Sequence, residues 1–256
     1  MSPIKWGVVV TTAPRSKPKL QITIDSLREA GWNDPIVFSE PHSYVSDAQT
    51  IHNSKKLGVW HNWIQAANYA MNLDVDVIMT VQDDIWVHPE SKLFAESALW
   101  PAEDCGYLSL YTPHHYSIIR GKKKPWGIYP VFTRSVWGAM CLVWEPKVLK
   151  EVIATNRARS WVGVKSKLGD KEFYRRQENP ELIRNLDTAL GYIITRDLNR
   201  KTYYCNPSCV QHISEDSSIG GRPATGKRCA RFLAGVDESP SPLNIPINQK
   251  KTKGLT

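Results

Sequence analysis

The sequence predicts an α/β fold, a Rossmann-type mixed sheet flanked by helices. Strand-like and helix-like segments alternate along the first half, as in parallel strands joined by crossover helices. The run from Val75 to Val81 is mostly apolar, as in a strand buried on both faces of a mainly parallel sheet. With 256 residues and 41% hydrophobic composition, the chain has the length and apolar content of one large globular domain.

The first half of the chain carries a clear signal for each of its elements. Gly31 is a typical stop for the first helix, and Trp60 and Trp63 lie on the apolar face of the second. We expect, in order, a strand over 4–11, a helix over 19–30, a strand over 35–39, a helix over 58–72 and a strand over 75–81. This order is that of a Rossmann-like half-domain.

The second half is predicted to add strands, helices and a basic loop. Pro146 stands at the favoured first position of a helix, and Leu190 and Ile194 have the helical spacing of inward-facing residues. In order, we expect a helix over 91–99, a strand over 106–111, a basic loop over 116–129, a strand over 136–144, a helix over 146–153, a helix over 186–198 and a strand over 201–210. Hydrophobic periodicity then fades, which indicates an extended tail.

Charge is distributed unevenly along the chain. Residues 1–110 contain 8 Lys and Arg against 13 Asp and Glu, which leaves 25 basic and 12 acidic groups for residues 111–256. The stretch 156–176 is especially basic. Such an asymmetry suggests that the second part faces a polyanion, and a solvated basic surface is the alternative.

Two adjacent carboxylates, Asp83 and Asp84, follow the strand over 75–81. Open α/β sheets bind ligands at the carboxyl ends of their strands, so the pair stands where a ligand site is expected. Two uncompensated carboxylates there would repel each other and resist desolvation. A divalent cation holding a diphosphate removes both difficulties, whereas the alternative is a strand end with two exposed acids. The motif predicts a Mg²⁺ or Mn²⁺ site with Asp84 as the first choice of ligand.

Several other classes of protein are disfavoured. The chain has no GxGxxG or Walker glycine pattern, which argues against ordinary dinucleotide and P-loop chemistry. No stretch approaches the roughly 20 apolar residues of a membrane span, and the amino terminus lacks a signal-peptide pattern. Five cysteines without a CxxC pair indicate neither a disulfide framework nor a zinc site. A cytoplasmic protein is expected, in the host cytoplasm if the source is viral.

The order of these features resembles the glycosyltransferases of the GT-A fold. In that family the amino half binds a nucleotide and ends in an acidic DXD element, and the carboxyl half binds the acceptor. LGVWHNWIQAANYAM and VDVIMTVQDDIWVHP (57–71 and 75–89) are similar to the family-2-type pattern. Gln82-Asp83-Asp84 resembles the EDD variant of some inverting N-acetylglucosaminyltransferases, with Gln in place of the first acid. The string NPSCVQHISEDSS (206–218) is similar to the end of the catalytic core in some of these enzymes.

The resemblance implies a set of ligand-binding residues. Asp84, Asp83 and His212 would hold Mn²⁺ or Mg²⁺; Asp83 has ribose or donor sugar as alternative partners, and His212 a phosphate oxygen or a purely structural role. The nucleotide-sugar donor would contact residues at the ends of the first strands and in a small-residue stretch: Thr11, Thr12, Arg15, Glu40, Asn62, Gln82, Asp83, Trp137 and Gly138.

Asp187, at the start of the helix over 186–198, occupies a place similar to that of the catalytic aspartate in inverting relatives. A carboxylate within hydrogen-bond reach of the acceptor hydroxyl suffices as a general base when the leaving group is good. An aspartate at a helix start is also an ordinary N-cap, worth about 1 kcal/mol. The two roles are compatible.

Acceptor contacts are expected from basic residues beside an aromatic ring. Proteins hold nucleic acid in this way, with Lys and Arg on phosphates and rings stacked on bases, and a mobile loop covering the donor is the alternative. The residues concerned are Arg120, Lys122, Lys123, Lys124, Trp126, Arg175 and Arg176.

Together these features predict a metal-dependent inverting glycosyltransferase that uses a nucleoside-diphosphate sugar, UDP-linked for preference. Residues 1–110 would bind the nucleotide sugar, 111–236 would form the acceptor-binding half of the same domain, and 237–256 an extended basic tail. The first choice of acceptor is a hydroxymethylated base in DNA, as in the sugar-modified genomes of some phages. A lipid-linked or cell-surface saccharide is one alternative, and a non-catalytic nucleic-acid-binding protein on the same fold is another.

Overall fold

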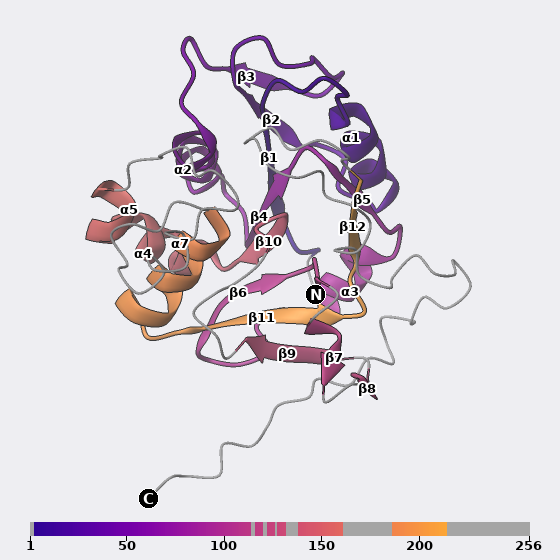
Figure 1. Cartoon of the computed structure of the whole chain (residues 1–256), viewed down its shortest axis with the longest axis vertical. Helices are drawn as coiled ribbons and strands as arrows, with labels where there is room; N and C mark the ends of the chain where they lie inside the picture. The colour runs from indigo at the N-terminus through magenta and orange to yellow at the C-terminus, as the bar shows by residue number, and fades with distance from the viewer. Residues whose placement is uncertain are drawn as a thin grey trace, which may run out of the picture.

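A mixed eight-stranded sheet with helices on both faces organises the molecule, which confirms the predicted fold class (Figure 1). The computed structural model of the chain describes residues 3–113, 116–119, 122–125, 127–131, 138–160 and 186–213. In sheet order, the strands are β3 (Thr50–His52), β2 (Ile36–Ser39), β1 (Trp6–Thr12), β4 (Val77–Gln82), β10 (Cys141–Trp144), β6 (Cys105–Ser109), β11 (Lys201–Asn206) and β9 (Gly127–Val131).

Two small sheets and the helices complete the described structure. The small antiparallel sheets pair β5 (Ile85–Val87) with β12 (Val210–His212), and β7 (Ile118–Ile119) with β8 (Lys122–Lys123). The helices are α1 (Leu20–Glu29), α2 (Val59–Ala70), α3 (Ser91–Ser97), α4 (Pro146–Ala154), α5 (Asn156–Ser160), α7 (Leu186–Tyr192) and the π-helix η3 (Ile193–Asp197). None of the helices in the described ranges has the length and apolar character needed to cross a bilayer.

The chain changes winding direction between β1 and β4. Strands β3, β2, β1 and β4 are parallel, and β10 runs antiparallel between β4 and β6. From β1 the chain moves outward through β2 to β3, and then returns through α2 to β4 on the opposite side of β1. In open α/β sheets such a switch point leaves a crevice at the carboxyl ends of the two strands, where ligands bind.

Alternate residues of the central strands pack on opposite faces of the sheet. Val8 and Val10 belong to a hydrophobic cluster with α1, β5 and α3, whereas Val9 packs in a second cluster with α2, α4 and α7. Figure 1 shows these two groups of elements on opposite sides of the sheet. Trp63 of α2 lies 6.0 Å from Trp144, ring centroid to ring centroid. Burial on both faces explains the apolar sequences of β1 and β4.

The predicted helices agree with the structure to within a few residues, but some strands were missed. β3 and β5 have three residues each, too few to show an alternating pattern. The prediction of a basic loop over 116–129 was wrong, because that segment contains the β7–β8 hairpin and the first residues of β9. β9 contains Pro130, and because β9 is the last strand of the sheet, a residue without an amide proton is tolerated there.

The last predicted strand is two strands, and the last predicted helix changes type. The segment 201–210 is divided by Pro207 into β11 and β12, which belong to different sheets. The helix over 186–198 continues from α7 into η3. η3 packs so closely on β6 that a Cβ at Gly106 would lie 2.4 Å from Ile194 Cγ2, so only glycine fits there. The predicted tail over 237–256 lies outside the described residues.

Candidate functional site

Polar residues gather at the edge of the sheet where the carboxyl ends of β1 and β4 meet. β1 ends at Thr12, and Arg15 comes three residues later. Glu40 follows β2 directly, and the acidic pair Asp83–Asp84 follows β4 directly. Because β1 and β4 are parallel, with Thr11 opposite Gln82, their carboxyl ends lie side by side. Both sides of the crevice therefore supply side chains to one place, as the positions of these residues in the sequence predict.

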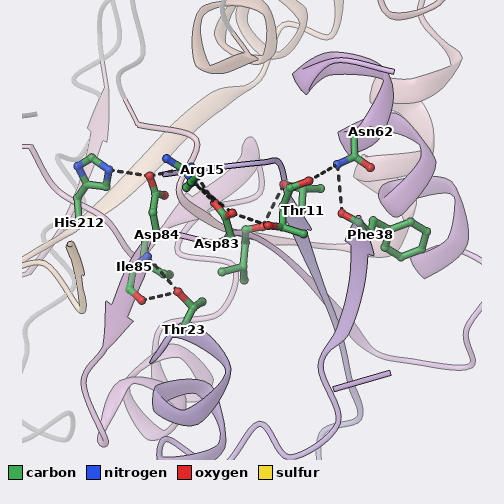
Figure 2. A network of polar contacts seen from close by, with 11 residues as sticks. Thr11, Arg15, Thr23, Phe38, Asn62, Asp83, Asp84, Ile85 and His212 are labelled. Atoms are coloured by element: carbon green, nitrogen blue, oxygen red, sulfur yellow. Dashed lines mark hydrogen bonds and ion pairs between the residues drawn. The ribbon is translucent and has the colours of Figure 1, made fainter. Parts of the chain in front are cut away.

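Arg15 bridges the two carboxylates of the acidic pair (Figure 2). Its Nη2 lies 2.7 Å from Asp83 Oδ1 and 3.0 Å from Asp84 Oδ2. Its Nε donates to both oxygens of Asp83, at 3.1 and 3.2 Å. The side chains of Arg15, Asp83 and Asp84 are only 8%, 4% and 5% exposed. The acidic pair is thus a buried ion-pair network and not the solvated strand end of the alternative interpretation.

Both oxygens of Asp83 are engaged by the protein itself. Besides the contacts of Arg15, the hydroxyl of Thr12 donates to Asp83 Oδ2 at 2.5 Å. Charge-assisted hydrogen bonds of this kind are strong and directional. Asp83 therefore ties the end of β4 to the end of β1, whatever ligand it also contacts.

Asp84 has one engaged oxygen and one open oxygen. His212 Nε2 lies 2.9 Å from Asp84 Oδ2, while Asp84 Oδ1 is buried and has no hydrogen-bond partner within the described part of the chain. Burial raises the pKa of Asp84, but the hydrogen bond from His212 and the positive charge of Arg15 outweigh it, so the pKa lies below its ordinary value. Buried polar atoms almost always have partners, so an ionised, open carboxylate oxygen points to a ligand.

The strand pair β5–β12 brings His212 to the acidic pair. His212 stands opposite Ile85 in this antiparallel ladder, and the Ile213 amide donates to the Asp84 carbonyl oxygen at 2.9 Å. The hydroxyl of Thr23 in α1 donates to the Ile85 carbonyl oxygen at 2.7 Å. The imidazole, 128 positions away in sequence, is therefore held by backbone pairing and not by a flexible loop.

The residue types of this cluster fit a divalent ion, but only partly. Among the residues that the structure describes, no group of three or more His, Cys, Asp or Glu side chains is arranged to hold a metal. The open oxygen of Asp84 and the imidazole of His212 are both ligand types that Mn²⁺ accepts. Mg²⁺ and Mn²⁺ commonly take one or two protein ligands and complete their shells with water and substrate phosphates. The cluster fits an ion held in that way.

Asn62 joins the ends of β1 and β2 and does so from the buried face of α2. Its Nδ2 donates to the carbonyl oxygens of Thr12 at 3.3 Å and Phe38 at 3.2 Å, and its Oδ1 accepts from Asn53 Nδ2 at 3.0 Å. Figure 2 shows this amide reaching both strands. Asn62 was predicted to contact the donor. In the structure its side-chain amide is hydrogen-bonded to the backbone of both strand ends and supports the position of Thr12.

Glu40 shapes the loop that precedes α2. Its carboxylate accepts hydrogen bonds from the backbone amides of Leu57, at 2.9 Å, and Gly58, at 2.6 Å. These amides stand at the amino end of α2, where a carboxylate is favoured by the helix dipole. The predicted contact of Glu40 with ribose or base would come in addition to this role.

Asp187 reaches the same edge of the sheet through Gly138. Because β10 runs antiparallel to β4, residues before β10 lie beside the carboxyl end of β4, and the Gln82 amide donates to the Met140 carbonyl oxygen at 2.9 Å. Asp187 Oδ2 accepts from the Gly138 amide at 3.0 Å, and Oδ1 from the Thr188 amide at 2.8 Å. Asp187 is the second residue of α7, and its carboxylate is hydrogen-bonded both to its own helix and to the segment before β10.

The environment of Asp187 favours its neutral form. Burial raises the pKa of this carboxyl, and the hydrogen bonds from the backbone amides of Gly138 and Thr188 only partly oppose the rise. Gly138 has a positive φ of 86°, and a Cβ there would lie 2.4 Å from the ring of Tyr111. No other residue fits at position 138 without a shift of Tyr111, so the anchor of Asp187 depends on this glycine.

Some of the remaining predicted residues are described by the structure, and the others lie outside the described ranges. Thr11 donates to the Val81 carbonyl oxygen at 3.4 Å, and the Gln82 side chain is partly buried beside the acidic pair. The Lys124 ammonium lies 4.9 and 5.1 Å from the ring centroids of Tyr129 and Tyr204. Outside the described residues are Arg120, Trp126, Trp137, Arg175 and Arg176, and for Lys122 and Lys123 only their place in β8 is described.

The aromatic group around Lys124 was not predicted. Tyr129 and Tyr204 stand opposite each other on β9 and β11, and Tyr116 lies 5.0 Å from Tyr204 between ring centroids. The sequence offered one signal, a pair of adjacent tyrosines at 203–204 in a strand, but the partner strand β9 had been taken for a loop. Lys124 is therefore already partnered by cation–π contacts within the protein.

The comparisons with known proteins give no family. No protein-family model and no curated protein matches the chain. Among solved structures, it is similar to glucosyl-3-phosphoglycerate synthase from Mycobacterium tuberculosis in complex with Mn²⁺, UDP and phosphoglyceric acid, with 13% identity and a TM-score of 0.29 over 41% of this chain and 42% of that one. The chain thus spans less than half of the synthase.

Two further solved structures align over more of the chain. A cytidylyltransferase from Leptospira borgpetersenii has 11% identity and a TM-score of 0.39 over 79% of this chain and 75% of that one. The protein A197 from STIV has 11% identity and a TM-score of 0.42 over 83% and 87%. At such low TM-scores these likenesses carry no argument about activity, so a function has to be inferred from the site itself.

Replacing Asn62 tests whether its hydrogen bonds stabilise the ends of β1 and β2. We expect Asn62→Leu to lower the free energy of unfolding by about 3 kcal/mol, because three buried hydrogen bonds of about 1 kcal/mol each are lost. Urea denaturation measures the change. The control is Asn68→Leu on the exposed face of the same helix, expected to change stability by less than about 0.5 kcal/mol. Equal losses in the two variants would contradict the role of Asn62.

Proposed function

We propose that this protein is a metal-dependent, inverting glycosyltransferase that takes its sugar from a nucleoside-diphosphate sugar, UDP-linked for preference. The observation that carries the proposal is the buried, open oxygen of Asp84 at the crevice between β1 and β4. The resemblance of the Gln82-Asp83-Asp84 segment and of the string around His212 to GT-A enzymes supports the same class. In support, four of the residues that the resemblance selects contact one another: Arg15, Asp83, Asp84 and His212.

The donor's diphosphate presents the main electrostatic problem of the reaction, because negative charge develops on it as it leaves. Asp84 and His212 would hold the divalent ion, which neutralises the leaving diphosphate. Arg15, with its planar fork of donors, is suited to contact phosphate oxygens. These groups are buried away from bulk water, and electrostatic interactions are stronger in such a water-excluded site.

Asp187 is proposed as the general base. The acceptor hydroxyl oxygen forms a bond to the anomeric carbon while the bond from that carbon to the diphosphate oxygen breaks, and the hydroxyl proton passes to the Asp187 carboxylate. Attack from the face opposite the leaving group inverts the anomeric centre. The raised pKa of Asp187 makes it a stronger base than an exposed aspartate. Gly138 would act through its backbone amide, which holds the Asp187 carboxylate at 3.0 Å.

For the acceptor we propose a hydroxymethylated base in DNA. The excess of basic over acidic groups in residues 111–256 supports a polyanionic acceptor. A base inside a duplex would have to be flipped out of the stack to reach Asp187. Of the residues predicted to hold this acceptor, Lys124 has its ammonium within the tyrosine group, so its contribution is to the local structure as well as to charge.

Binding of nucleotide and metal is tested by thermal shift. We expect UDP with Mn²⁺ to raise the Tm of the protein, since a ligand at 100 times its Kd stabilises the folded state by about 2.7 kcal/mol. Asp84→Asn should lose the Mn²⁺-dependent part of the shift, whereas Asp74→Asn, an exposed aspartate, should keep it. If no nucleoside diphosphate stabilised the protein with or without Mn²⁺, the proposal would be wrong.

The role of Asp187 is tested by transfer kinetics. Asp187→Asn should lower the rate of sugar transfer by about 10³-fold while leaving donor affinity within about twofold. Because burial raises the pKa of Asp187 and the ionised form is the base, the wild-type rate should rise with pH through a value above the ordinary 3.9 or so of aspartate. Asp197→Asn, on the following π-helix, serves as control. A normal transfer rate in Asp187→Asn would contradict the assignment.

The acceptor is tested by mass spectrometry. Hydroxymethylated DNA incubated with the protein, Mn²⁺ and mixed sugar nucleotides should gain the mass of one sugar on the modified base, and unmodified DNA should gain none. Labelling of a lipid-linked or surface saccharide in place of DNA would contradict the acceptor but leave the transferase class intact. DNA binding that weakens steeply with salt and does not respond to nucleotide sugar would instead indicate a non-catalytic DNA-binding protein.

A further inference from the structure

The guanidinium of Arg15 contacts three of the four carboxylate oxygens of the acidic pair and so blocks their access to a ligand. Of the four carboxylate oxygens, Asp83 Oδ1 contacts Arg15, Asp83 Oδ2 contacts Arg15 and Thr12, and Asp84 Oδ2 contacts Arg15 and His212. Of these four oxygens, Asp84 Oδ1 alone has no hydrogen-bond partner among the residues that the structure describes. The arrangement is compact and excludes solvent, since Arg15 is only 8% exposed in its side chain. One of the two negative charges of the acidic pair is therefore already balanced by the chain's own cation.

A divalent ion brought to this pair would meet that cation. Arg15 Nη2 lies 3.0 Å from Asp84 Oδ2, the second oxygen of the carboxylate whose first oxygen is open. Two like charges so close together in a desolvated site repel each other strongly. The same guanidinium also contacts both oxygens of Asp83, which would otherwise attract the ion. With Arg15 in this position, the pair attracts a metal less strongly than two carboxylates without a guanidinium would.

A diphosphate changes this balance. A guanidinium matches phosphate oxygens as well as it matches carboxylates, so the donor can take over the contacts of Arg15. Once Arg15 turns to the diphosphate, the oxygens of Asp84 become available to a cation, and the diphosphate adds negative charge of its own. Exchange of Arg15 between carboxylates and diphosphate would then link the two binding events.

We propose that Arg15 is a positioning residue that closes the Asp83–Asp84 pair in the absence of donor, so that metal and nucleoside diphosphate bind cooperatively. The proposal rests on the proposed function. By linkage, the factor by which the diphosphate tightens metal binding equals the factor by which metal tightens diphosphate binding. If Arg15 were only a structural counter-ion, its removal would lower stability without strengthening metal binding.

Binding of Mn²⁺ alone, followed by electron paramagnetic resonance of the free ion, tests the proposal without any activity measurement. In the wild-type protein, UDP should tighten Mn²⁺ binding by about tenfold or more. In Arg15→Gln, Mn²⁺ should bind without UDP about tenfold more tightly than in the wild type, and UDP should tighten it further by less than about threefold. Arg28→Gln, which removes an exposed guanidinium paired with Asp47, should behave as the wild type.

The outcomes separate this proposal from the proposed function. If Arg15→Gln bound Mn²⁺ without UDP no better than the wild type, the closing role would be wrong, while UDP-dependent Mn²⁺ binding in the wild type would leave the transferase proposal standing. If neither the wild type nor Arg28→Gln bound Mn²⁺ in the presence of UDP, both proposals would be wrong. Circular dichroism checks folding. Should Arg15→Gln fail to fold, Arg15→Lys takes its place in the test, because it loses the two-pronged contact. If UDP tightened Mn²⁺ binding in Arg15→Lys as much as in the wild type, the proposal would be overturned.

Discussion

The parallel pairing of β1 with β4 is the constraint on which the site depends. It aligns Thr11 with Gln82, so the residues that follow each strand emerge at neighbouring points of one edge. Only then can a single guanidinium span Asp83 and Asp84 while a threonine hydroxyl from β1 donates to the first of them. The apolar residues on both faces of these strands hold the pairing in place, because they are buried by helices on each side. Core packing and site geometry are thus parts of one arrangement.

A second constraint on the site comes from two strands in the carboxyl half of the chain, β10 and β12. The antiparallel strand β10 delivers Gly138 to the same edge, and β12 delivers His212, so the carboxyl half of the chain completes a site begun by the amino half. Charge compensation follows the same division. The acidic pair and Arg15 come from the amino half, whereas the imidazole that lowers the pKa of Asp84 comes from the carboxyl half.

Much of this could be predicted from local pattern alone. Amphipathic spacing predicted α1 and α2, and the position of Asp83 and Asp84 after an apolar strand predicted the sheet edge at which the polar cluster lies, because parallel strands end together. Other features could not be predicted, since they depend on contacts between residues far apart in sequence. Nothing near Asn62 indicates that its amide is used by two strand ends, and nothing near Arg15 indicates that its partners are carboxylates. Three-residue strands such as β5 carry no periodicity, although β5 positions the imidazole.

The separation of 128 positions between Asp84 and His212 has a consequence for how the protein is made. A ribosome releases the acidic pair long before the strand that carries the imidazole. Until that strand joins β5, the nascent domain holds two crowded carboxylates with one of their hydrogen-bond partners still missing. Closing so long a loop is slow compared with forming local helices. The α1–β1–β4 layer is therefore expected to assemble first, and the chemistry of the crevice to mature as one of the last steps of folding.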